Sequence, residues 1–176
     1  MRKLIALIVA SFALHAQAAL PDGAPAPDFT TQASLGGNTF DYSLKSALKN
    51  GPVVLYFYPA AFTSGCTIEA HNFAEAIDDF KALGATVIGV SKDSIETLKR
   101  FSVSECRGKF AVAADSDQKI TKAYDAIFAP KPEYANRISY VISPDGKIIY
   151  SHADMNPEKH VANTLAALKK WRAAQK

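Results

Sequence analysis

The sequence contains few cysteines, no strong excess of charge and, beyond its first residues, no long apolar run. Only two of its 176 residues are cysteines, which excludes the disulfide-dense scaffolds of small secreted domains. After residue 18 no segment offers the roughly 18 apolar residues that a membrane-spanning helix needs. Lys and Arg number 20 against 17 Asp and Glu, so we expect no nucleic-acid partner and no membrane partner. Repeats and low-complexity tracts are also missing.

The first residues form a segment of their own. The start "MRK" is basic, residues 4–14 are apolar, and "AQA" just before residue 19 has a small-x-small pattern. This order predicts a secretory signal peptide over residues 1–18 with cleavage after Ala18. The alternative is an uncleaved N-terminal anchor, for which the apolar stretch is short. We therefore predict an exported, periplasmic protein in which residues 19–176 form one domain.

Three unbroken apolar runs predict strands that are buried on both faces of a sheet. They are "VVLYFY" (53–58), "ATVIGVS" (85–91) and "ISYVIS" (138–143). "KIIYSH" follows the last run across a Pro-Asp-Gly turn, which predicts an antiparallel hairpin. We predict a short strand in "KFAVAAD" and a small N-terminal hairpin in "FTTQAS" and "NTFDY", on either side of a Gly-Gly pair.

Helical patterns fill the intervals between these strands. The longest covers about residues 65–83 and has an apolar stripe opposite its acidic residues. "KDSIETLKRF" predicts a helix with Asp93 as its N-cap, and "SDQKITKAYDA" predicts a shorter one. The final pattern, "NPEKHVANTLAALKKW", predicts a helix with Asn156 as its cap and Pro157 at its first position.

The order of these elements predicts the fold. Alternating strands and helices favour parallel pairing with right-handed crossovers, and the closing hairpin must add antiparallel strands to the same sheet. We therefore predict an α/β, thioredoxin-like single domain, with a central mixed β-sheet flanked by helices.

The two cysteines, Cys66 and Cys106, allow two interpretations. In an exported protein a pair of cysteines predicts one structural disulfide, which would stabilise the fold by about 4 kcal/mol on a chain-entropy estimate. The position of Cys66 favours a reactive thiol instead. It lies just beyond the strand 53–58 and in the first turn of the next helix. Ligand sites of α/β sheets occur there, and the helix dipole favours a thiolate.

Two neighbours of Cys66 fit a reactive thiol. Thr63 can place its hydroxyl beside the sulfur or beside an oxygen that approaches it, and Pro59 fixes the backbone where the strand ends. Each residue also has an ordinary explanation, since Thr63 is a suitable helix N-cap and Pro59 a suitable strand terminator. Their combination at this spacing, at the open end of the sheet, favours a reactive site.

The pattern Pro59-x-x-x-Thr63-x-x-Cys66, continued as "CTIEA", resembles the motif of the peroxiredoxins and of their Q-type (bacterioferritin comigratory protein) branch. The similarity extends over nearly all of residues 19–176 through "APDF", "VIGVSKDS" and "RISYVISPDGKI". It implies a thiol-dependent peroxidase that reduces hydrogen peroxide and organic hydroperoxides. In such an enzyme Cys66 would attack a peroxide oxygen and become a sulfenic acid.

The resemblance also implies roles for Arg137 and Glu69. Arg137 stands where the family carries an arginine at the start of a strand, and its charged fork of donors suits both a thiolate and a peroxide oxygen. Glu69 matches an acidic position that follows the cysteine, and it would orient Arg137 or a backbone group. The ordinary alternatives are a surface arginine and an acidic residue that complements the helix dipole.

Cys106 is, by the same resemblance, the candidate resolving thiol. Q-type relatives often carry that thiol five residues after the first cysteine, where this chain has His71, but a variant of the branch carries it in or just past the next helix. The resemblance implies a reducible disulfide between Cys66 and Cys106, which a thioredoxin-like or other thiol reductant reopens. A one-cysteine mechanism, with Cys106 inert, is the alternative.

Two other classes of protein use this type of fold. A thiol–disulfide oxidoreductase would need Cys-x-x-Cys and a proline before the hairpin strand, where this chain has Thr63 and Arg137. A non-enzymatic binding module, such as a copper chaperone, would need paired cysteines near a histidine. Because His71, His152 and His160 have no metal-ligand spacing, we predict no metal and no cofactor. The Q-type resemblance implies a monomer or a weak dimer.

Overall fold

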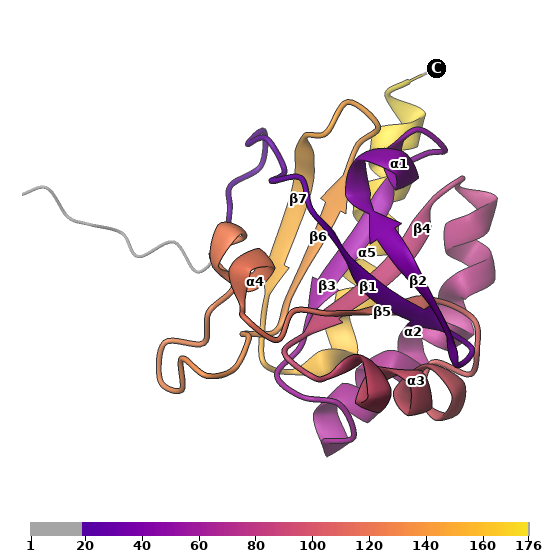
Figure 1. Ribbon diagram of the computed structural model, residues 1–176. Coiled ribbons are helices and arrows are strands. Elements are labelled where there is room, and N and C mark those ends of the chain that lie inside the picture. Colours follow the sequence, from indigo (N-terminus) through magenta and orange to yellow (C-terminus); the bar gives the residue numbers. More distant parts are fainter. Residues whose placement is uncertain (1–18, 176) are drawn as a thin grey trace, which may run out of the picture.

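The apolar runs of the sequence form one seven-stranded sheet in the computed structural model, which describes residues 19–175 (Figure 1). The strands are β1 (Thr30–Leu35), β2 (Asn38–Ser43), β3 (Val53–Phe57), β4 (Thr86–Ser91), β5 (Ala111–Ala114), β6 (Ile138–Ile142) and β7 (Ile148–Ala153). Their order across the sheet is β2-β1-β5-β4-β3-β6-β7. β3, β4 and β5 pair in parallel, and all other neighbours pair antiparallel, so the predicted mixed sheet is confirmed.

Helices connect the strands and cover both faces of the sheet. They are α1 (Leu44–Leu48), α2 (Ser64–Ala82), α3 (Ile95–Ser104), α4 (Lys119–Ala123), the 3₁₀ turn η1 (Pro157–Lys159) and α5 (His160–Ala173). The sequence did not predict α1, because five residues are too few to show a helical period. The predicted cap Asn156 and the proline after it open η1, and the α-helix proper begins at His160.

The central strand β3 shows why both faces must be covered. All five of its residues are buried, and successive side chains point to opposite faces. Val54 and Tyr56 lie in one hydrophobic cluster with residues of α2, α3 and α5, whereas Leu55 and Phe57 lie in another with residues of α1 and α4. α2 and α5 accordingly lie on one side of the sheet and α4 on the other (Figure 1).

The predicted N-cap of α3 was wrong by one residue. Ser94 is the N-cap, and its hydroxyl accepts a hydrogen bond from the backbone N–H of Thr97. Asp93 does not cap the helix, because its Oδ2 already accepts from the backbone N–H of Ala61 at 2.7 Å and from the Ser91 hydroxyl at 2.7 Å. The carboxylate therefore connects the β4–α3 loop to the segment that precedes α2.

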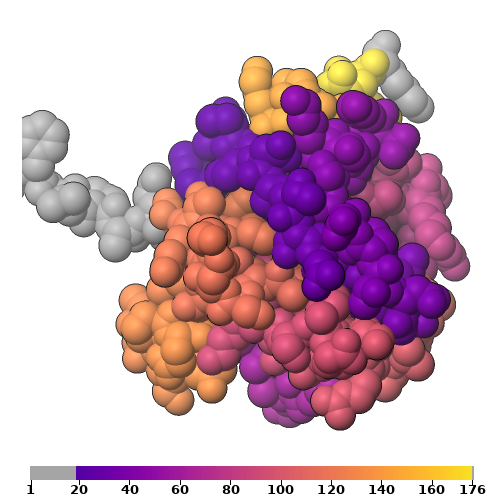
Figure 2. Space-filling view, in the orientation of Figure 1, coloured from indigo at the N-terminus to yellow at the C-terminus, as the bar shows by residue number. Residues whose placement is uncertain are grey.

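The N-terminal part of the described chain lies on the sheet edge. β1 and β2 form the predicted hairpin, which continues the sheet beyond β5 and runs as an indigo band across the face shown in Figure 2. The predicted signal peptide, residues 1–18, lies outside the described residues. Within residues 19–175, no helix combines the length and apolar character that crossing a membrane requires.

Candidate active site

The chain turns sharply between β3 and α2, and this turn sets the position of Cys66. Thr63 is the N-cap residue of α2, and the carbonyl of Thr63 accepts the helical hydrogen bond from the N–H of Thr67 at 2.9 Å. Cys66 therefore lies in the first turn of α2, beyond the C-terminal end of β3. Unpaired N–H groups and the positive end of the helix dipole lie at this place, and both favour a thiolate.

Thr63 and Pro59 shape the turn. The Thr63 hydroxyl donates to the carbonyl of Ala60 at 3.0 Å, so it fixes the loop and does not cap a helical N–H. Thr63 is exposed and Pro59 is half-buried. Thr63 therefore occupies the N-cap position of α2, as the alternative interpretation predicted, but its side chain makes no capping hydrogen bond.

Arg137 reaches Cys66 from the neighbouring strand. It directly precedes β6, and its Nη2 lies 3.5 Å from Cys66 Sγ. Both residues are buried, with exposed fractions of 3% for Arg137 and 1% for Cys66. A Cβ at Gly65 would lie only 3.0 Å from the same Nη2, so the glycine leaves space for this approach. The sequence predicted a reactive thiol at the open end of the sheet, but in the reduced structure the Cys66 sulfur is covered.

The Arg137 guanidinium is held by each of its nitrogens. Nη1 forms an ion pair with Glu69 Oε2, and Nε donates to the backbone carbonyl of Met155 at 3.0 Å. Burial lowers the pKa of Arg137, but Glu69 and Cys66 more than offset this effect and raise it above its ordinary value. The guanidinium therefore remains charged and directs Nη2 at the sulfur.

Glu69 lies one helical turn after Cys66 and is fully buried. Burial raises the pKa of its carboxyl to about 8, although the charge of Arg137 opposes this shift. The predicted contact between Glu69 and Arg137 is present in the structure.

A buried histidine continues this network, and the sequence interpretation did not include it. His160 Nδ1 lies 3.6 Å from Glu69 Oε1 and 2.8 Å from the Ser139 hydroxyl. In the sequence, the histidines were considered only as possible metal ligands. The signal that could have found His160 is its place on the buried face of α5, where it shares a stripe with Thr164 and Leu168.

Cys106 lies just past the end of α3, where its N–H donates to the carbonyl of Phe101 at 3.1 Å. Both cysteines are free thiols, so the structural disulfide that composition favoured is not formed. Cys106 is fully buried, and burial raises the pKa of its thiol well above the ordinary range. The two cysteines lie in one hydrophobic cluster, together with Tyr56, Tyr58 and Phe101.

Contacts join the segment before α2 to α3. The Phe62 ring meets the Phe101 ring edge-on, with 5.2 Å between their centroids, and the Tyr58 ring stacks on Phe101 at 5.6 Å. Phe62 has a positive φ of 64° and is 47% exposed. Together with the Asp93–Ala61 hydrogen bond, these contacts connect the element that carries Cys66 to the one that precedes Cys106.

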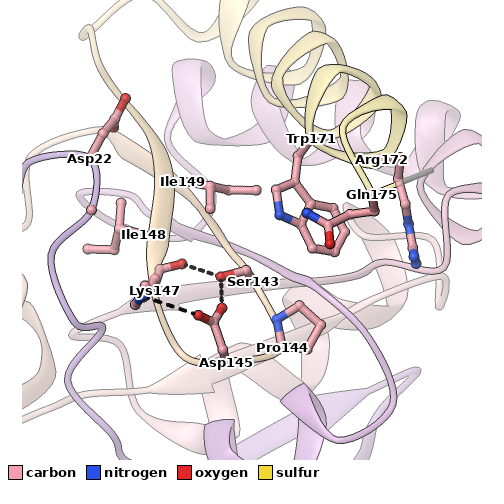
Figure 3. A pocket seen from close by; sticks show the side chains of 11 residues that line it. Asp22, Ser143, Pro144, Asp145, Lys147, Ile148, Ile149, Trp171, Arg172 and Gln175 are labelled. Atoms are coloured by element: carbon pink, nitrogen blue, oxygen red, sulfur yellow. Dashed lines mark hydrogen bonds and ion pairs between the residues drawn. The ribbon is translucent and has the colours of Figure 1, made fainter.

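The hollow of about 540 Å³ shown in Figure 3 is a separate feature. It is lined by Ser143, Trp171, Arg172 and their neighbours. Ser143 follows the end of β6, whereas Arg137 precedes its start. The hollow therefore lies at the opposite end of the strand from the cysteine site, and it contributes no residue to it.

Comparisons with known proteins agree with this geometry. Residues 23–151 match the model of the AhpC/TSA family. Over 128 residues the chain is 36% identical to the chloroplastic peroxiredoxin Q of Sedum lineare, covering 70% of this chain and 66% of the relative. It is 33% identical over 152 residues to a Mycobacterium tuberculosis protein named as a peroxiredoxin, covering 81% of this chain and 91% of the relative.

The chain is also similar to a solved peroxiredoxin structure. Peroxiredoxin Q of Xanthomonas campestris superposes with a TM-score of 0.70 at 29% identity, over 80% of this chain and 90% of that one. The chain spans slightly less than two thirds of the length of two plant relatives, 66% for Sedum lineare and 65% for Oryza sativa. From the family match, these relatives and this neighbour, we conclude that the chain belongs to the AhpC/TSA family, in its peroxiredoxin Q type.

Proposed function

We propose that this protein is a thiol-dependent peroxidase that reduces hydrogen peroxide and organic hydroperoxides at Cys66. The observation that carries the proposal is the 3.5 Å contact between Arg137 Nη2 and Cys66 Sγ at the N-terminus of α2. A fixed guanidinium and a helix dipole both stabilise a thiolate, which is the nucleophilic form of cysteine. The same donors suit the oxygen that takes up negative charge as the peroxide bond breaks.

The chemical step follows from these positions. The Cys66 thiolate attacks one peroxide oxygen, the O–O bond breaks, and the other oxygen leaves with a proton as water or an alcohol. Cys66 is oxidised to a sulfenic acid, and the peroxide is reduced by two electrons. Because Cys66 is only 1% exposed, the segment around Pro59 and Thr63 must open slightly to admit the peroxide.

The proposal includes resolution by Cys106. The Cys106 thiol condenses with the sulfenic acid of Cys66, so that a disulfide forms and water leaves. Cys106 is buried in the reduced form, and burial raises the pKa of its thiol, so α3 must loosen before this sulfur becomes nucleophilic. Two thiols of a thioredoxin-like protein or another dithiol donor then reduce the disulfide. We propose that the enzyme works as a monomer or a weak dimer.

Intact-mass analysis after one equivalent of hydrogen peroxide tests this function. The wild type should lose two hydrogen atoms, as a new disulfide requires, whereas Cys106→Ser should gain one oxygen and over-oxidise with more peroxide. Cys66→Ser should remain unmodified. If the wild type stays reduced, the peroxidase proposal is wrong and a thiol–disulfide oxidoreductase becomes the better one. If Cys106→Ser cycles normally with a dithiol, only the resolving role fails.

We further propose that the protein acts in a periplasm after removal of residues 1–18. The proposal rests on the basic, apolar and small-residue pattern of that segment. N-terminal sequencing of the protein purified from its own cells should begin at Ala19. A protein that retains Met1 or residues 4–14 would contradict it.

A further inference from the structure

His160 is a fully buried histidine whose proton position can be deduced from its partners. Its Nε2 lies 2.8 Å from the backbone carbonyl of Asp154, which can only accept, so Nε2 carries a hydrogen. Burial lowers the pKa of His160 to about 4, so the ring is uncharged at neutral pH. Nδ1 therefore presents a lone pair, which accepts from the Ser139 hydroxyl at 2.8 Å.

The same lone pair faces an oxygen of Glu69. Oε2 of this carboxyl pairs with Arg137, but Oε1 is buried and has no hydrogen-bond partner. The nearest polar contact recorded for Oε1 is His160 Nδ1 at 3.6 Å. An ionised oxygen without a donor, opposite a lone pair, is costly in a buried place. Because Nδ1 already accepts from Ser139, His160 offers Oε1 no donor, and a protonated Oε1 avoids the repulsion that an ionised oxygen would meet there.

The charge balance of the site also favours a proton on Glu69. Arg137 supplies one positive charge, whereas the Cys66 thiolate and an ionised Glu69 would supply two negative charges in a buried place. A buried anion without a compensating cation is unfavourable, so one of the two groups must retain a proton. When Cys66 ionises, that group is Glu69.

We propose that His160 is a positioning residue of the Cys66 site. Its uncharged ring keeps a proton on Glu69, so that the positive charge of Arg137 stabilises the Cys66 thiolate and is not neutralised by Glu69. The inference rests on the proposed role of Cys66 and deepens it. His160 does not touch the sulfur; it acts through Glu69 and Arg137.

Other ionisable groups surround this pair. Glu69 faces Arg137 from the start of β6, Tyr56 from β3, Cys66 from its own helix and His160 from α5. His160 in turn faces two residues of the β7 region. His152 lies 4.7 Å from it between ring centroids, and Asp154 contributes its carbonyl and, at longer range, its carboxylate. The charge of Lys159 acts on His152.

Infrared spectroscopy of the reduced protein tests the proton on Glu69 without any turnover. Ordinary Asp and Glu side chains are ionised at pH 7. The wild type should therefore show a protonated-carboxyl stretch that Glu69→Gln lacks, and raising the pH beyond about 8 should abolish it. A wild-type spectrum with only ionised carboxylates at pH 7 would overturn the proposal.

Two variants test the part played by His160. In His160→Asn an amide N–H can replace the lone pair and bind an ionised Glu69, so the protonated-carboxyl band should disappear. The ratio of Cys66 thiolate to thiol at a fixed pH, followed by thiolate absorbance, should then fall by about tenfold. In Ser139→Ala the Nδ1 lone pair is free for Glu69, so the band should persist to higher pH.

The matched control is His152→Asn, because His152 adjoins His160 but has no recorded contact with Glu69. This variant should keep both the carboxyl band and the thiolate absorbance of the wild type. If His160→Asn and Ser139→Ala also keep the wild-type carboxyl band and thiolate absorbance, His160 is a packing residue and the proposal is wrong. Failure of the peroxidase function would leave these two readouts unchanged, so the two proposals fail separately.

Discussion

At the scale of single residues, the site depends on one guanidinium placed against one sulfur. Arg137 is fixed by Glu69 and by the Met155 carbonyl, so its Nη2 has little freedom to leave Cys66. Because a charged donor near a thiol shifts its ionisation, the position of this side chain sets the fraction of thiolate.

Replacing the guanidinium should therefore weaken the nucleophile. In Arg137→Met we expect a smaller fraction of Cys66 thiolate at pH 7, and we expect the rate of peroxide reduction to fall at least about tenfold. Thiolate absorbance and stopped-flow kinetics measure both. Arg100→Met, at an exposed position of α3, is the matched control and should change neither value. An unchanged thiolate absorbance at pH 7 in Arg137→Met would refute the electrostatic role.

Gly65 tests the same contact by sterics alone. In Gly65→Ala the new Cβ would lie 3.0 Å from Arg137 Nη2, which must shift by a few tenths of an ångström and disturb its contact with Cys66. A helical Gly→Ala change itself stabilises by up to about 1 kcal/mol, so the melting temperature should not fall. We expect unchanged or higher thermal stability together with several-fold slower peroxide reduction. Ser64→Ala, at the exposed neighbour, should retain the wild-type rate, and equal rates for the two variants would contradict the steric argument.

At the scale of elements, the segment before α2 and the start of α3 are connected. Asp93 accepts hydrogen bonds from Ala61 N–H and from the Ser91 hydroxyl, and Phe62 packs on Phe101. Disulfide formation requires Cα atoms within about 7 Å, and both sulfurs are buried and free in the reduced form. In the proposed mechanism, these connections open before Cys106 resolves the sulfenic acid of Cys66.

Weakening the Asp93 contacts should favour that opening. In Asp93→Asn the charge-assisted bonds become ordinary ones, which are about half as strong. We expect faster conversion of the Cys66 sulfenic acid to a disulfide and less sulfinic acid at high peroxide, both measured by quenched-flow mass spectrometry. Asp117→Asn, an exposed carboxylate on another loop, serves as the control. Slower disulfide formation in Asp93→Asn would show that the Asp93 contacts to the segment before α2 promote resolution and do not hinder it.

Much of the element pattern could be predicted from the sequence, for a physical reason. Strands such as β3 are buried on both faces, so their composition alone identifies them. Asp93 was assigned to the wrong role because its partner Ala61 is distant in sequence, and a capping pattern does not reveal a competing donor. His160 was missed for the same reason, since its partners Glu69 and Ser139 come from α2 and β6.

At the scale of the whole molecule, the buried network links the proposed active site to the stability of the fold. His160 brings together α2, β6, the residues after β7 and its own helix α5. Its pKa is lowered by burial from 6.5 to about 4. The unfolded chain therefore binds a proton there more readily than the folded one, and this contribution to stability is complete above pH 6.5 and is lost as the pH falls towards 4.

The effect can be isolated in a Glu69→Gln background, where the neighbouring carboxyl no longer titrates. Between pH 7 and pH 4, the free energy of unfolding in urea should fall by up to about 3 kcal/mol more in Glu69→Gln than in the double variant Glu69→Gln/His160→Asn. Identical pH dependence in the two proteins would mean that His160 does not titrate with unfolding.

The central claim is that the Cys66 sulfur is ionised beside Arg137 and is the atom that attacks peroxide. Stopped-flow reduction of hydrogen peroxide by the reduced wild type and by Cys66→Ser tests it most directly. We predict a single rapid turnover in the wild type, faster than that of an ordinary free thiol, and no turnover above the buffer background in Cys66→Ser. Rapid peroxide consumption by Cys66→Ser, or a wild-type rate no faster than that of an ordinary free thiol, would contradict the account.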